Sequence, residues 1–181
     1  MLFGDYNPSG KLTVTFPRSV GQIPLYYNYK NTGRPILEKD RYSSKYIDSP
    51  NTPLIPFGHG LSYTTFKYSN LQLHKKQLSI PDSLTITADI KNTGSRLGEE
   101  VVQLYIRDLV GSVTRPVKEL KGFKKISLEP GQTKKVSFIL TTDDLKFYDI
   151  NMEYNVEPGN FRLWVGPGSA QGLKETFEII D

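Results

Sequence analysis

The sequence contains no cysteine, only two histidines and no long run of apolar residues. Without cysteine the chain has no disulfide framework, thiolate metal ligand or cysteine nucleophile. No stretch approaches the ~18 apolar residues of a transmembrane helix. The first residues, Met1 to Tyr6, also lack the charged and apolar regions of a signal peptide. We therefore expect any export signal of the natural protein to lie outside this sequence.

Positive charge is in slight excess but is not concentrated. The net charge is +4, and the densest basic runs are the pairs Lys75-Lys76, Lys124-Lys125 and Lys134-Lys135. A nucleic-acid-binding protein gathers its basic residues in one stripe. These pairs are typical of solvated strand faces, so we expect no nucleic-acid partner and no membrane partner.

Residues 1–65 have the composition of an irregular segment. Seven of the twelve prolines precede Tyr68, and proline removes a backbone donor and restricts its predecessor. We expect loops here, with one strand over Leu12 to Phe16 after the turn at Asn7 to Gly10. So long an irregular stretch needs a larger body to pack against. Its apolar residues Leu25, Tyr26 and Tyr27 would otherwise favour self-association.

From Phe66 the hydrophobic period becomes two. Leu84, Ile86, Ala88 and Ile90 alternate with polar residues, which predicts a strand with one buried face. The same pattern and the turns between predict strands at 66–73, 84–91, 102–106, 120–128, 136–140, 161–165 and 177–180. About seven short strands without helical periodicity indicate a mainly β fold, an immunoglobulin or fibronectin type III-like β-sandwich over residues 66–181.

The alternation also predicts which side chains form the core. Trp164 is out of phase with its neighbours, and we expect it to pack under a loop or against the N-terminal segment rather than to stack on a sugar. The predicted core residues are Leu84, Ile86, Ile90, Val102, Leu104, Ile106, Phe123, Val136, Phe138, Leu163 and Val165.

The acidic pairs and His59 do not point to a catalytic or metal site. Glu99 and Glu100 are adjacent on a strand, so their side chains point to opposite faces. Asp143-Asp144 follows two threonines, as in a turn or a helix cap. His59 has no second histidine nearby in the sequence, so we predict no metal and no cofactor.

Three motifs, in order, resemble the C-terminal part of family 3 glycoside hydrolases of the bacterial periplasmic β-glucosidase type. They cover essentially the whole chain. The first motif is Gly4-Asp5-Tyr6-Asn7-Pro8-Ser9-Gly10 with Thr15-Phe16-Pro17-Arg18-Ser19-Val20-Gly21-Gln22-Ile23-Pro24; the second is Pro56-Phe57-Gly58-His59-Gly60-Leu61-Ser62-Tyr63-Thr64-Thr65-Phe66; the third joins Asn92-Thr93-Gly94, Gly98-Glu99-Glu100-Val101-Val102-Gln103-Leu104-Tyr105 and Arg115-Pro116-Val117-Lys118-Glu119-Leu120-Lys121-Gly122-Phe123.

The resemblance implies that residues 1–65 are the tail of the family's α/β domain with a linker, and that 66–181 are its fibronectin type III-like domain. It implies a parent enzyme, periplasmic or secreted, that hydrolyses terminal β-D-glucosyl residues with retention. Such chemistry uses two carboxyl groups roughly 5 Å apart. In the family these lie upstream, and the nucleophilic Asp precedes a Trp, a pair absent here. No catalytic residue is therefore assigned in this chain.

One stretch of the N-terminal segment has the side chains that suit sugar hydroxyls. Arg41, Tyr42, Tyr46 and Asp48 combine donors, acceptors and aromatic rings. We predict that they line the outer rim of the parent's substrate pocket. The alternative for these residues is simple packing of a loop against the sandwich.

The expected function is a non-catalytic structural fragment whose partners are the remaining domains of the parent glycosidase and, through them, a β-glucoside or oligosaccharide. One alternative is a stand-alone carbohydrate-binding module, which needs a row of coplanar exposed aromatic rings. Another is an adhesion domain of the fibronectin type, but the chain has neither an Arg-Gly-Asp loop nor a tandem repeat.

Overall fold

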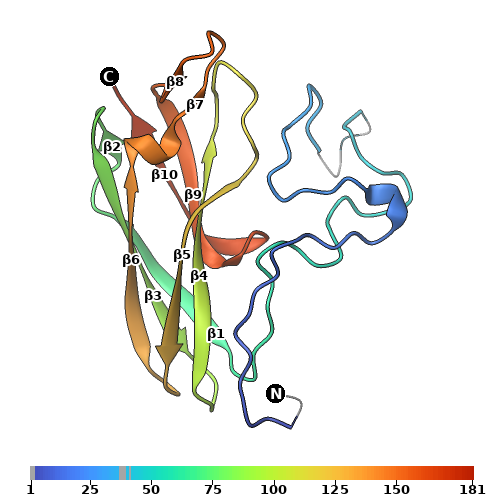
Figure 1. The fold of residues 1–181 in the computed structure, drawn as a ribbon, viewed down its shortest axis with the longest axis vertical. Helices are drawn as coiled ribbons and strands as arrows, with labels where there is room; N and C mark the ends of the chain where they lie inside the picture. Colours follow the sequence, from blue (N-terminus) through green and yellow to red (C-terminus); the bar gives the residue numbers. More distant parts are fainter. Residues whose placement is uncertain (1–2, 37–39, 41) are drawn as a thin grey trace.

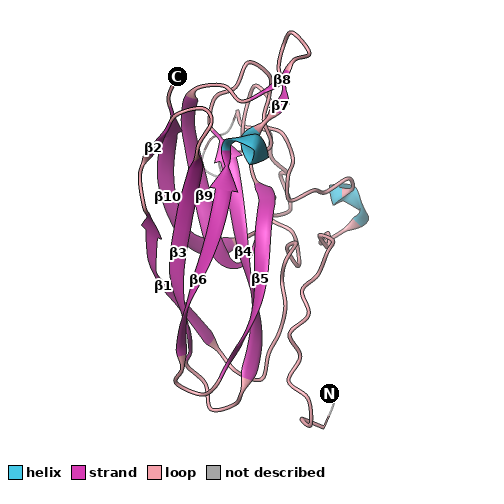
Figure 2. Cartoon of the chain, turned by 60° about the vertical axis from the view of Figure 1, so that its left-hand side comes forward, coloured by secondary structure: helices cyan, strands magenta, loops and turns pink. Residues whose placement is uncertain are grey.

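A computed structural model describes residues 3–36, 40 and 42–181. Its body is a sandwich of two twisted β-sheets, and the N-terminal segment, residues 3–65, lies along one side of it (Figure 1). Coloured by secondary structure, the described chain is almost entirely strand and loop, with the short helical turns η1 and η2 (Figure 2). None of the helices in the described ranges has the length and hydrophobicity that a membrane span requires.

The smaller sheet has three antiparallel strands in the order β1-β3-β6. They are β1 (Phe66–Leu73), β3 (Ser83–Asn92) and β6 (Thr133–Thr141). Along β3 every second residue is buried, and inward residues such as Ala88 pair across the ladder with inward residues such as Val136. The period-two pattern of the sequence therefore sets the register.

The larger sheet has five strands in the order β2-β10-β9-β4-β5. They are β2 (Gln77–Leu78), β10 (Gln171–Ile179), β9 (Gly159–Gly168), β4 (Gly98–Asp108) and β5 (Glu119–Leu128). A small hairpin of β7 (Phe147–Tyr148) and β8 (Tyr154–Asn155) lies at one end. All seven expected strands are present, so the predicted β-sandwich is confirmed.

The core lies between the two sheets. Ten of the predicted core residues are buried in it, joined by Leu140, Phe161, Phe177 and others. Phe123 is the exception, because 67% of its surface is exposed. The inward position on this part of β5 belongs to Gly122, where an added Cβ would lie 3.3 Å from the ring of Phe138. A register shift opposite Leu104 and Tyr105 accompanies this change of phase, so the prediction for Phe123 was wrong.

The Asp143-Asp144 pair begins a short helix, as expected. η2 (Thr142–Leu145) has Thr141 as its N-cap. The hydroxyl of Thr141 accepts from the backbone N–H of Asp144, and the Asp144 carboxylate accepts from the backbone N–H of Thr141. This is a reciprocal capping box, which satisfies donors that a helix start leaves free.

The predicted strand at Leu12 to Phe16 does not form. The stretch is paired at its two ends only: Leu12 exchanges backbone hydrogen bonds with Gly58 and His59, and Phe16 bonds with Leu54 and Ile55. A bend at residues 13–14 separates the two pairings. The bend prevents a continuous ladder, so the prediction of a strand here was wrong.

Beyond this pairing the described residues 16–36, 40 and 42–55 form an arm, which carries η1 (Val20–Gln22) and stands beside the sandwich (Figure 1). Gln22 is 2% exposed and organises its base. Its Oε1 accepts from the N–H of Arg18, and its Nε2 donates to the carbonyl of Pro50 at 2.8 Å. A buried amide thus replaces the regular backbone bonding that the proline-rich sequence cannot supply.

Candidate functional site: the seam between the N-terminal segment and the sandwich

The N-terminal segment covers the outer face of β4. From Val102 to Ile106 every residue of this strand is buried, although the sequence alternates between apolar and polar or aromatic side chains. The apolar residues face the core, and Gln103 and Tyr105 face the segment. We call this contact the seam.

Gln103 and Tyr105 form the polar centre of the seam. The amide Nε2 of Gln103 donates to the carbonyls of Gly58 and Pro167, at 3.1 and 2.8 Å. The hydroxyl of Tyr105 donates to Oε1 of Gln103, and burial raises the pKa of this phenol. Every donor and acceptor of the Gln103 side chain that faces the seam is therefore used, which fixes the segment in one position.

Gly58 allows the segment to approach this closely. Its φ of +79° lies in the region that favours glycine, and a Cβ at this position would lie 2.9 Å from the Tyr105 hydroxyl and 3.0 Å from the Cα of Gly168. A side chain would push the segment off the sheet. The glycine at this position of the Pro56 to Phe66 motif is therefore explained by the close packing at the seam.

A buried ion pair crosses the seam beside this centre. The ammonium of Lys11 lies 3.0 and 3.2 Å from the two carboxylate oxygens of Glu100, and the side chains are 13% and 5% exposed. The hydroxyl of Tyr68 donates to the same carboxylate at 2.8 Å. Burial, with the nearby negative charge of Glu100, raises the pKa of Tyr68, so its phenol stays a hydrogen-bond donor.

The neighbouring carboxylate, Glu99, is also held by a lysine. It lies 2.7 Å from Lys125 and accepts from the hydroxyl of Ser9. The hydrogen bond from Lys125 keeps the pKa of Glu99 below its ordinary value. Glu99 and Glu100 line one hollow of about 300 Å³, but each is paired with its own cation. The lowered pKa of Glu99 is the opposite of what a protonated general acid needs.

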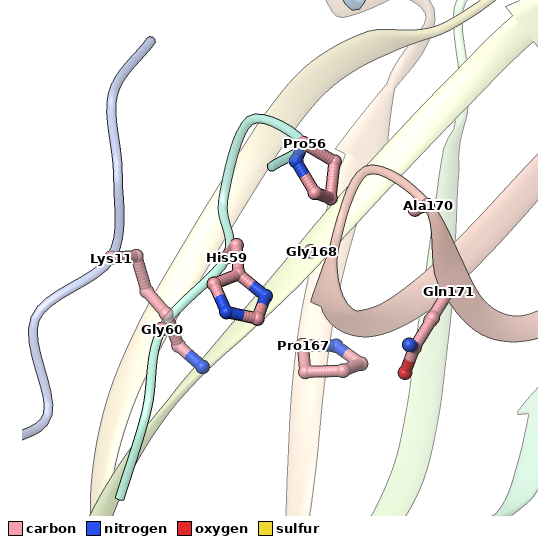
Figure 3. Close-up of a pocket in the computed structure, with 8 residues that line it drawn as sticks. All are labelled: Lys11, Pro56, His59, Gly60, Pro167, Gly168, Ala170 and Gln171. Atoms are coloured by element: carbon pink, nitrogen blue, oxygen red, sulfur yellow. The ribbon is translucent and has the colours of Figure 1, made fainter. Parts of the chain in front are cut away.

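Two further hollows lie along the seam. One of about 140 Å³ is bounded by the segment at Lys11, Pro56 and His59 and by the turn between β9 and β10 (Figure 3). His59 itself is exposed, and its carbonyl accepts from Leu12. Within the described ranges, no three His, Asp or Glu side chains lie close enough together to hold a metal ion.

The other hollow, about 230 Å³, lies where the arm meets the sandwich. Here the ring of Tyr27 stacks on Phe57 with centroids 4.2 Å apart. The backbone N–H of Val117, in the loop between β4 and β5, donates to the carbonyl of Tyr29. The N–H of Leu120, at the start of β5, donates to the hydroxyl of Tyr27. The arm is therefore anchored by its aromatic residues.

Lys118 lies in the wall of this hollow. Its Nζ donates to the carbonyl of Ser169 at 2.6 Å and lies 4.2 Å from the ring centre of Trp164. Burial lowers the pKa of Lys118 to about 8, while the facing indole ring favours the charged form. Trp164 thus packs beneath a loop residue, as predicted for a tryptophan out of phase with its strand.

Three of the four predicted sugar-contacting residues, Tyr42, Tyr46 and Asp48, lie in the arm and not at the seam. Tyr42 is 72% exposed and Tyr46 is 41% exposed, and Asp48 is exposed as well. The backbone N–H of Tyr46 donates to Asn51. Arg41 lies outside the described residues. Tyr42, Tyr46 and Asp48 line none of the seam hollows described above, so their role as a pocket rim stays a prediction.

Sequence reasoning missed Gln103, Tyr105 and Lys11 as contacts between the two parts of the chain. The alternation along this strand predicts one buried face and does not indicate that the other face is covered too. A large aromatic residue at an outward position of a central strand was the available signal, because such a ring favours a cover over that face. No pattern in the sequence pairs Lys11 with Glu100.

Two domain families match the chain. Residues 1–63 match the glycosyl hydrolase family 3 C-terminal domain, and residues 100–169 match the fibronectin type III-like domain. The sequence is 48% identical to the periplasmic beta-glucosidase of Salmonella typhimurium over 99% of this chain, which is 24% of that protein. It is 45% identical to a beta-xylosidase of Formosa agariphila, over 96% of this chain and 24% of that protein.

Solved structures agree with these relatives. The crystal structure of a beta-glucosidase from Listeria innocua in complex with glucose superposes with a TM-score of 0.94 at 43% identity. The match covers 99% of this chain and 25% of that one. The chain thus spans about a quarter of the length of the proteins it matches. It belongs to glycosyl hydrolase family 3 and corresponds to the C-terminal part of that family's members, the end of the C-terminal domain followed by the fibronectin type III-like domain.

Proposed function

We propose that the chain is the C-terminal structural part of a retaining β-glycosidase that removes terminal β-D-glucosyl residues. The seam carries this proposal. Its buried ion pair between Lys11 and Glu100 and its satisfied Gln103 amide attach the end of the family 3 C-terminal domain rigidly to the sandwich. In this role the Glu100 carboxylate, bound by Lys11, holds the two parts of the chain together.

We divide the chain into residues 1–65, the tail of the α/β domain with its linker, and residues 66–181, the sandwich. The outward side of the first part supports this division, because it exposes apolar side chains that a larger body would cover. They include Val14, Phe16, Val20, Ile23 and Leu54. The proposed partner on this side is the remainder of the glycosidase, which contains the catalytic carboxyl pair.

The name of the Salmonella relative supports a periplasmic or secreted location for the parent enzyme. Beta-glucosidase and beta-xylosidase names both occur among the relatives. Both sugars carry equatorial hydroxyls, so the proposal includes either as the terminal residue. Selection between them belongs to the part of the relatives outside this chain.

A chimera tests the proposal. The corresponding C-terminal quarter of the Salmonella beta-glucosidase is replaced by this chain, and hydrolysis of p-nitrophenyl β-D-glucopyranoside is measured for the chimera and for the chain alone. We expect turnover by the chimera and none by the chain. Turnover by the chain that survives further purification, or a folded chimera without activity, contradicts the proposal.

The same chimera tests the proposed pocket rim. Replacing Arg41 and Tyr46 by alanine removes a donor and a ring from the arm, and we expect KM for the aryl glucoside to rise several-fold with a smaller change in kcat. The matched control replaces Tyr154, which is 58% exposed on the far hairpin. Unchanged KM and kcat in the arm variant remove Arg41 and Tyr46 from the proposal.

The alternative of a carbohydrate-binding module for polymers has little support in the sandwich. The exposed pair Tyr148 and Tyr154 at the β7–β8 hairpin is tilted by 44°, so the two rings do not form one flat platform. Retention of the chain on insoluble β-glucan in a pull-down, lost in a Tyr148→Ala variant, is the result that favours this alternative.

A further inference from the structure

The hollow between the arm and the sandwich has the composition of a small-ligand site. Its volume is about 230 Å³, below the roughly 300–1,000 Å³ of pockets for drug-sized ligands. The space suits a ligand of one ring. Its walls consist mainly of aromatic and aliphatic side chains, together with Lys118 and the polar residues Asn51 and Thr15. The aromatic residues are Tyr26, Tyr27, Tyr29 and Phe57.

Aromatic rings provide the apolar walls. The stacked pair Tyr27 and Phe57 is fixed between the arm and β4, and the ring centre of Tyr27 lies 5.9 Å from that of Tyr105 in an edge-to-face arrangement. Tyr26 and Tyr29 are 59% and 41% exposed, so their rings are accessible from solvent. The accessible rings of Tyr26 and Tyr29, beside the fixed Tyr27–Phe57 pair, offer aromatic faces on which the C–H groups of a ligand can stack.

Lys118 provides the polar group. An ammonium has three N–H donors, and one of them goes to the Ser169 carbonyl. The apolar surroundings strengthen any further hydrogen bond that this group makes. The hollow therefore presents a cation at one point of an otherwise mainly apolar wall, which fixes the orientation of a ligand with hydroxyl groups.

We propose that this hollow binds a single pyranose ring with all-equatorial substituents, of the β-gluco or β-xylo type. Such a ring has two faces of axial C–H bonds for the tyrosines and a rim of hydroxyl oxygens for Lys118. An axial hydroxyl, as in galactose or mannose, places a polar group against a ring face. The choice of a sugar among one-ring ligands rests on the proposed glycosidase function.

The chain's single tryptophan makes binding measurable without a label. Trp164 contacts the ammonium of Lys118, so a ligand that engages Lys118 changes the environment of the indole. Methyl β-D-glucopyranoside is titrated into the full chain while Trp164 fluorescence is recorded. We expect a saturable change with a dissociation constant in the millimolar range, and binding about fivefold weaker for methyl β-D-galactopyranoside and methyl α-D-mannopyranoside.

Two variants locate the site. Tyr26→Ala removes an exposed ring and Tyr29→Ala keeps the backbone bond to Val117, so neither replaces a core residue. Each is expected to weaken binding about fivefold to tenfold. The matched control Tyr154→Ala removes an equally exposed tyrosine from the β7–β8 hairpin and should leave the titration unchanged.

A titration without saturation for the glucoside overturns the proposal, as does saturation that both tyrosine variants leave unchanged. Saturation by phenol but by no methyl pyranoside also overturns it and identifies an aryl site instead. The outcome is separable from that of the proposed function. The titration uses the chain alone, whereas the glycosidase role is tested by turnover of the chimera.

Discussion

The ammonium of Lys11 donates to both carboxylate oxygens of Glu100, a residue 89 positions later in the chain. This ion pair joins the two parts of the molecule where both side chains are almost completely covered. Removing one partner leaves the other charge buried without compensation. The pair is therefore the contact on which the stability of the seam depends most directly.

Replacing Lys11 by methionine is expected to lower the free energy of unfolding by about 3–5 kcal/mol. The aliphatic stem of methionine keeps most of the packing, so the loss reports the uncompensated Glu100 carboxylate. Urea denaturation of both proteins measures it. Lys125→Met is the matched control, since its partner Glu99 is far more exposed, and exposed pairs contribute little. Equal losses in both variants contradict the burial of the Lys11 pair.

Gly58→Ala is expected to destabilise the chain by roughly 2–5 kcal/mol, the sum of a left-handed backbone and an overpacked contact. The added methyl would collide with Gln103 and Tyr105. Gly131→Ala controls for the backbone, because Gly131 has a similar φ of +76° but an open surrounding. Its loss should be about 1–2 kcal/mol. Denaturation curves that coincide for the two variants exclude the close approach at Gly58.

Lys118 should make stability rise with pH above about 8. Burial lowers its pKa in the folded chain from 10.5 to about 8. Between these values the unfolded chain holds a proton that the folded chain has lost, so stability increases with pH in this window. Below pH 8 both states are charged, and the penalty of burying the charge is constant.

Lys118→Met removes this dependence. The measurement is the difference in unfolding free energy between wild type and variant from pH 7 to 10.5, which cancels the titration of other groups. The difference should be flat to about pH 8 and then shift in favour of the wild type. Trp164 fluorescence of the folded wild type should titrate near the same pH, because the neutral amine loses its attraction to the ring.

The exposed apolar side of the N-terminal segment should drive self-association of the isolated chain. Val20 and Ile23 are 84% and 62% exposed, and replacing both by aspartate adds charge without touching the core. Sedimentation velocity at several concentrations should show association in the wild type and a monomer in the variant. The matched control replaces Val110 and Ile150, which are equally exposed on the sandwich, and should associate like the wild type.

The β-sandwich could be predicted from the sequence because its signals are local. On β3 alternate residues face the core, and alternation in sequence becomes alternation in burial with no knowledge of the partner strands. The turn sequence Glu129-Pro130-Gly131-Gln132 lies between the end of β5 and the start of β6. The one wrong core residue, Phe123, follows from a register shift that depends on the packing of Phe138 over Gly122.

The seam could not be predicted in the same way, because its contacts join residues far apart. Gln103 bonds to Gly58 across 45 residues, and Ser169 bonds to Phe57 across 112. Taken alone, Gln103 or Ser169 has the sequence signature of a side chain that faces solvent. The irregular segment up to residue 65 correctly indicated that something packs on it, but not that the outer face of β4 is its nearest support.

The covering of β4 on both faces has a consequence for how this sandwich can be moved between proteins. A chain cut at Phe66 would keep every strand of the sandwich. It would nevertheless expose Tyr105, which is completely buried when the N-terminal segment is present. It would also leave the Gln103 amide without the carbonyl of Gly58 that accepts its hydrogen bond. A fragment that keeps these contacts must therefore be longer than residues 66–181, which form the β-sandwich itself. A transplantable version must take the seam-forming stretches of the preceding segment with it.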